Sequence, residues 1–115
     1  MAIIVNIKTR GSSSLSTLSG NIVLDEQKGE LRISRKINGS PVVINKIDIN
    51  GNHYYDIHGV ERISTGIDPS SGRIRELFFD EDGKSQIIIG QNPKNGKQII
   101  AVSKPGVDII KELNN

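Results

Sequence analysis

The chain has 115 residues, no cysteine and a formal net charge of +2. This length allows one domain with a modest core, while the lack of cysteine excludes a disulfide framework or a thiolate zinc site. The apolar runs are far shorter than the roughly 20 residues of a membrane helix, and no basic leader precedes an apolar block at the N-terminus, so we expect neither a membrane partner nor a secretory signal.

The apolar residues are unusually rich in β-branched types. The chain has 20 Ile and 7 Val, against only two Ala, and its 12 Gly are spread along its length. Ile and Val pack well on a pleated surface, and a glycine about every ten residues suits short strands joined by turns. We predict an all-β domain over residues 1–115, a small antiparallel β-sandwich or barrel made of hairpins.

The N-terminal third begins with a predicted strand at Ile3–Lys8. A Ser-rich segment follows at Gly11–Gly20, which we interpret as a loop or arm, or alternatively as a strand that another subunit completes. Leu31–Ile37 shows the alternation of a half-buried strand. Asn38-Gly39 and Asn50-Gly51 then supply residues that tolerate positive φ in tight hairpin turns.

The C-terminal part continues the pattern of hairpins. Strands are predicted at Val60–Thr65 and Arg73–Phe79, with a loop over residues 66–72 between them. Asp80-Glu81-Asp82-Gly83 resembles part of a calcium loop, but its flanks lack the remaining ligands, so we interpret it as a tight acidic turn. Residues 107–115 form the last segment, whose apolar spacing allows a short helix or an extended tail.

One cluster is dense in titratable residues: His53, Asp56, His58, Glu61 and Arg62. A nuclease-type toxin could use a histidine as general base and Arg62 to stabilise phosphate charge. However, His53 and His58 differ by an odd number, so in a strand they would point to opposite faces. We therefore expect no catalytic residue, no metal and no cofactor here, and predict a contact surface formed by His53, Tyr54, Tyr55, His58 and Arg62.

Two further sets of side chains bear on partners. Four lysines surround the last predicted hairpin, namely Lys84, Lys94, Lys97 and Lys104, and lysines at strand ends usually serve solubility. The four aromatic residues are too few for a platform on which bases stack. We therefore expect no nucleic-acid partner.

The stretch Ile87–Asp108 is the most distinctive. A strand ending in Ile88-Ile89-Gly90 is followed by a loop and then by a strand that ends in Ser103-Lys104-Pro105-Gly106-Val107-Asp108. Physically, Pro105 removes a ladder donor and Gly106 turns the chain sharply, so we predict a structural corner there, formed by Gly90, Ser103, Lys104, Pro105, Gly106 and Asp108. The sequence of this stretch resembles a segment of tail fibre, tail tip and baseplate proteins of long-tailed bacteriophages. It carries no known catalytic residue of that family.

This resemblance implies a structural component of a phage or prophage virion, associated with the tail, baseplate or fibre. We expect a protein that is not an enzyme, is made in the bacterial host cytoplasm, and acts as a homo-oligomer in contact with other virion proteins. Two alternatives stay open at this point: a small phage-encoded inhibitor of a host defence protein, and the His/Arg nuclease-type toxin.

Overall fold

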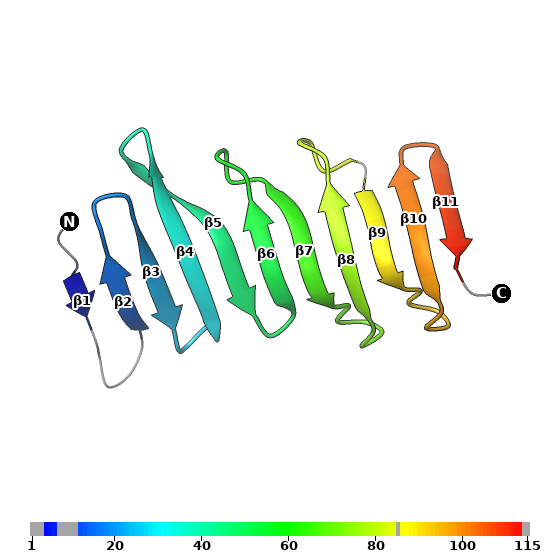
Figure 1. Ribbon diagram of the computed structural model, residues 1–115, viewed down its shortest axis with the longest axis horizontal. Helices are drawn as coiled ribbons and strands as arrows, with labels where there is room; N and C mark the ends of the chain where they lie inside the picture. The colour runs from blue at the N-terminus through cyan, green and yellow to red at the C-terminus, as the bar shows by residue number, and fades with distance from the viewer. Residues whose placement is uncertain (1–3, 7–11, 85, 114–115) are drawn as a thin grey trace.

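The computed structural model describes residues 4–6, 12–84 and 86–113. These residues form one sheet of eleven antiparallel strands, and each strand lies beside the strands that precede and follow it in sequence. Figure 1 shows the strands side by side from β1 to β11, with the turns at the two ends of the strands. The described residues include no helix that could span a membrane. The strands are β1 Ile4–Asn6, β2 Ser12–Ser16, β3 Gly20–Asp25, β4 Glu30–Ile37, β5 Ser40–Asp48, β6 Gly51–Tyr55, β7 Glu61–Ile67, β8 Ile74–Phe79, β9 Gln86–Gln91, β10 Gln98–Lys104 and β11 Val107–Glu112.

The predicted all-β class and the succession of antiparallel hairpins are confirmed. The predicted closure into a sandwich or barrel is wrong for the single chain, because β1 and β11 lie at opposite edges of an open sheet. A sandwich or barrel would need pairing between strands distant in sequence. Every pairing here is between consecutive strands, since each turn is short enough to return the chain beside itself.

Two segments take conformations that the sequence pattern did not favour. The Ser-rich segment contains β2, which is paired on both sides within the same chain (Gly11 lies outside the described residues). The C-terminal segment is a strand and no helix, because Val107–Glu112 pairs along its whole length with β10. The ladder to β10 satisfies backbone groups that a helix of one or two turns would leave open. Of the first predicted strand, Ile3–Lys8, only residues 4–6 lie within the described part.

The tight turns follow the sequence signals. Asn38 and Gly39 have φ angles of 52° and 80°, as a two-residue hairpin turn of the primed type requires. Pro105-Gly106 also forms a two-residue turn, in which Lys104 pairs with Val107 and Gly106 has a φ of 78°. The predicted corner is therefore a β-hairpin between β10 and β11.

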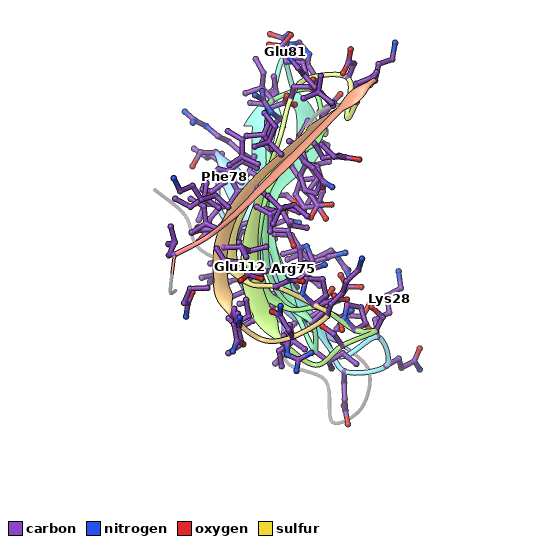
Figure 2. The ribbon with its side chains drawn as sticks, turned by 90° about the vertical axis from the view of Figure 1, so that its right-hand side faces the viewer. Lys28, Arg75, Phe78, Glu81 and Glu112 are labelled. Atoms are coloured by element: carbon purple, nitrogen blue, oxygen red, sulfur yellow. The ribbon has the colours of Figure 1, made fainter. Side chains whose placement is uncertain are left out.

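The sheet is bent, so its two faces differ. Figure 2 shows a crescent in profile, with Phe78 on its convex side and Arg75 on the other. We call these sides the convex face and the concave face, and assign residues to them by register. Three glycines, Gly51, Gly66 and Gly90, lie on the concave face in the same crosswise row as Arg75.

We call these three glycines the glycine crease, because they allow the sheet to bend. Their φ angles of 134°, 148° and 141° belong to a region that only glycine adopts without strain. A Cβ atom at Gly90 would lie 2.7 Å from Cα of Arg75, and one at Gly66 would overlap the carbonyl oxygen of Asn50. The neighbouring strands therefore approach where a side chain would otherwise stand.

The core is small and lies on the concave side of the C-terminal strands. Leu77, Ile99 and Ala101 are the buried hydrophobic residues of the described chain, at 8%, 2% and 4% exposure. Register places all three on the concave face, where the bend brings side chains together. Residues 4–6, 12–84 and 86–113 form this one sheet and no second layer over it.

Candidate functional site

The densest polar cluster of the concave face centres on His53 in β6. Its Nδ1 lies 2.7 Å from Oε1 of Glu61, and its Nε2 lies 3.1 Å from Oδ1 of Asp48. The Ser64 hydroxyl is 3.4 Å from the same Nδ1. Strand register explains the grouping, because β6 pairs with β5 on one side and with β7 on the other.

The arrangement of Asp48, His53 and Ser64 resembles a nucleophilic triad in outline. A triad histidine needs one ring nitrogen with a free lone pair facing the serine. Here Glu61 contacts Nδ1 at a much shorter distance than Ser64 does, and Asp48 contacts the other nitrogen. Because both ring nitrogens of His53 already contact carboxylates, neither is left facing Ser64 as a base, so this geometry favours a polar cluster over a triad.

The electrostatics of the cluster fit paired charges. Burial alone would raise the pKa of Asp48, but hydrogen bonds from His53 and from the Asn50 amide outweigh it and hold the pKa below the ordinary 3.8. Burial likewise lowers the pKa of Lys46, but Tyr55 and Asp48 more than offset this effect and raise it. Both groups are therefore held in their charged forms at neutral pH.

The structure separates the other predicted cluster members from His53. His58 lies in the turn after β6, where its amide donates to Oδ1 of Asp56 at 2.9 Å. Arg62 donates through Nε to the carbonyl oxygen of Phe79 at 2.8 Å and lies 3.7 Å from Asp56. The two histidines and Arg62 therefore do not converge on one point, and Arg62 ties β7 to the end of β8.

Arg62 also lines a shallow hollow of about 390 Å³ at the ends of the C-terminal strands. The full lining consists of Arg62, Phe78, Phe79, Asp80, Gln86, Ile87, Val102 and Lys104.

Within the described residues, no group of three or more His, Asp or Glu side chains is placed to hold a metal ion. The carboxylates of Asp80 and Asp82 both accept from the backbone amide of Lys84, at 3.0 Å. The predicted acidic turn is confirmed.

The corner residues and aromatic pairs have structural positions. Ser103 pairs with Asp108 beside the Pro105-Gly106 turn, while Gly90 belongs to the glycine crease at the other end of the strands. The two pairs of adjacent aromatic residues split between the faces. Register places Tyr54 and Phe78 on the convex face, and Tyr55 and Phe79 on the concave face.

The predicted lysine group is divided between the two ends of the strands. Lys84 lies in the β8–β9 turn and Lys104 is the last residue of β10, at one end of the strands, whereas Lys94 and Lys97 belong to the β9–β10 loop at the other end. Lys97 lies 3.5 Å from Glu112. The four lysines do not form one basic face.

The convex face carries the feature that sequence analysis missed. One residue from each strand from β2 to β11 lies in a single crosswise row, which we call the apolar row, and nine of these ten residues are aliphatic or aromatic. Ten of the 15 exposed large hydrophobic residues of the described chain lie on this face. The apolar row consists of Leu15, Ile22, Ile33, Asn45, Tyr54, Ile63, Phe78, Ile87, Val102 and Ile109.

Sequence analysis missed two features, the contact of Asp48 with His53 and the apolar row, and the turns bear on both. The two-residue turn between β5 and β6 is Ile49-Asn50, one residue earlier than the predicted Asn50-Gly51 turn. It places Asp48 opposite Gly51 and Lys46 opposite His53, so the predicted hairpin alone would have brought Asp48 close to the cluster. The apolar row could be recognised only with the registers of all the hairpins at once.

No family model matches the chain, and neither a curated protein nor a solved structure matches it.

Proposed function

We propose that this protein is a structural component that acts by assembly, in contact with copies of itself and with other proteins. We place it in the virion of a phage or prophage, in the tail, baseplate or fibre apparatus. Its work is association rather than catalysis. Its location during synthesis is the cytoplasm of the bacterial host.

The observation that carries this proposal is the excess of exposed surface. The chain exposes 8057 Å², whereas a compact monomer of 12.6 kDa is expected to expose roughly 6,200 Å². The difference of about 1,900 Å² is more than the share that each partner contributes to a standard interface. A protein of this size is normally stabilised by burying such surface, and here another molecule has to cover it.

The single-layer architecture supports the same conclusion. An antiparallel sheet with one apolar face is stable when that face packs against another layer. Monomeric soluble proteins rarely expose contiguous apolar patches larger than a few hundred Å². The exposed Ile, Leu and Tyr side chains therefore favour an assembly role.

The virion setting rests on the resemblance of Ile87–Asp108 to tail fibre, tail tip and baseplate proteins. This segment forms β9, β10 and the turn into β11. It contributes Ile87 and Val102 to the apolar row, so the residues that carry the resemblance also belong to the surface that needs a partner.

Mass spectrometry of purified phage particles tests the setting. We expect peptides of this chain at a constant ratio to the major tail proteins across independent preparations. Absence from particles, together with a one-to-one complex with a host protein, would replace the virion assignment by the inhibitor alternative.

Light scattering coupled to size-exclusion chromatography tests assembly itself. The expected mass is at least twice the 12.6 kDa of the chain. A folded monomer at high protein concentration would contradict the proposal.

A further inference from the structure

We propose that the convex face is the surface that binds a second copy of this chain, so that two sheets pack into a two-layer structure. This inference rests on the proposed function, since it names the face by which assembly occurs. It also supplies the second layer that sequence analysis expected and the single chain does not form.

The apolar row selects this face. Its residues run across the sheet from β2 to β11, and Asn45 is the one member of the row with an amide side chain. Tyr54 and Ile87 are 43% and 44% exposed, and Ile109 is 58% exposed. The flanking row on the same face is less apolar at its centre, where Asn52, Thr65 and Glu76 interrupt it. The apolar character is thus concentrated along one line.

Most of the side-chain ion pairs within the sheet lie on the other face. Three of the five Arg or Lys ion pairs between described residues, and both contacts of His53 with carboxylates, join side chains that register places on the concave face of β3–β7. Examples are Arg32 with Asp25 at 3.4 Å and His53 with Glu61 at 2.7 Å. A face that neutralises its own charges loses favourable hydration when covered, so the concave face of these strands is suited to water.

The size of the convex face matches the surface that needs covering. The molecule measures 55 × 32 × 20 Å, so one broad side projects at most about 1,800 Å². This is close to the excess of about 1,900 Å² derived from the size scaling. Because two convex faces touch along their crests, each copy would bury about half of this side, and the pair would bury roughly 1,800 Å², the standard size of a stable interface.

Symmetry indicates where contact is densest. A two-fold axis that lies between the two sheets, parallel to the strands and over β6, the sixth of eleven strands, would bring the convex face of one copy against the convex face of the other. Tyr54 of β6 and Ile63 of β7 pair across these central strands. Because the face is convex (Figure 2), two copies meet first along the crest, and a buried central tyrosine is a typical energetic anchor of an interface.

Thiol labelling tests the assignment directly, because the chain has no cysteine. Ile87→Cys places a thiol on the convex face, and Ile110→Cys places one on the concave face, at positions 44% and 63% exposed in the single chain. In the full chain at micromolar concentration we expect a maleimide to label Ile87→Cys at least tenfold more slowly than Ile110→Cys. The two rates should converge when urea unfolds the chains or when dilution dissociates them.

Charge insertion gives the second measurement. Ile87→Lys would bury an unpaired charge in the interface, which weakens association roughly 100-fold or more, and light scattering should show a monomer with an unchanged far-UV circular dichroism spectrum. The matched control, Ile110→Lys, should stay assembled. If Ile87→Lys does not fold, the labelling rates decide.

The outcomes separate this inference from the proposed function. An assembled wild-type chain with a protected Ile87→Cys thiol supports both. An assembled chain in which Ile87→Cys and Ile110→Cys react equally fast overturns the convex interface and leaves assembly standing. A monomeric wild-type chain overturns both.

Discussion

Replacing Gly66 by alanine should be among the most destabilising changes on the surface of this protein. Gly66 has a φ of 148°, and a Cβ atom there would overlap the carbonyl oxygen of Asn50. The same oxygen accepts a hydrogen bond of 2.8 Å from the amide of Ile67. Because the obstructing atom is backbone, no side-chain rotation relieves the overlap, and β7 has to move away from the β5–β6 turn.

The magnitude follows from two contributions. Holding a residue with a Cβ in this region of φ costs of the order of 1–3 kcal/mol, and losing the hydrogen bond to Asn50 costs about 1 kcal/mol. Together they predict a loss of about 2–4 kcal/mol in the free energy of unfolding. For a chain of this size, that corresponds to a decrease of roughly 8–16 °C in Tm.

Gly29→Ala is the matched control. Gly29 also has a positive φ, 66°, but an added Cβ would meet nothing within 4 Å, so only the conformational cost of about 1 kcal/mol remains. Both variants are unfolded by heat at one protein concentration, since assembly makes Tm depend on concentration, and circular dichroism at 218 nm follows the sheet. A difference below about 0.5 kcal/mol between them would refute the role of the glycine crease.

Three further predictions concern the core and the charged groups. Ile99→Ala, at a position 2% exposed, should cost about 3 kcal/mol in urea unfolding, whereas Ile57→Ala, at a position 55% exposed, should cost less than about 1 kcal/mol; equal losses would contradict the assigned core. Burial raises the pKa of Asp48, but hydrogen bonds lower it further, to below its ordinary 3.8, so its contribution to stability is complete above the unfolded pKa and is lost as the pH falls through the folded pKa. Urea unfolding between about pH 2 and 6 should show this loss, and Asp48→Asn should reduce the slope; an unchanged slope would exclude Asp48 as its source. Glu112→Gln removes the ion pair with Lys97 at 3.5 Å and should lower the urea midpoint only slightly, a difference that about 1 M NaCl should diminish; a loss that salt leaves unchanged would indicate a role other than charge pairing.

Local features of the fold could be predicted from the sequence. The Asn38-Gly39 turn, the acidic turn before β9 and the strand alternation of Leu31–Ile37 depend on a few neighbouring residues, and the structure confirms them. The C-terminal strand could not be predicted, because the spacing of Val107–Leu113 suits a helix and only pairing with β10 makes it extended. Tertiary pairing overrides a weak local pattern there.

The candidate site shows the same limit. Tyr54 and Tyr55 lie on opposite faces, which follows from the sequence because alternation is a property of one strand. The sequence did not join Asp48 and Ser64 to His53, because these contacts cross between three strands. The face of the sheet to which an isoleucine belongs depends on every register along the row, including the irregularities at Ile33–Ser34 and Tyr54–Tyr55.

Because the strands follow one another in the sheet in chain order, the length of the sheet is set by the number of strands. Adjacent strands in a sheet lie about 4.8 Å apart, so position along the 55 Å axis reports position along the chain. Inserting one hairpin into a turn would lengthen the sheet by about 10 Å, separate only the two strands that flank this turn, and leave every other pair of neighbours unchanged. Evolution or engineering could thus adjust the span of an object built from this chain by duplicating short stretches of sequence, without redesigning a shared interior.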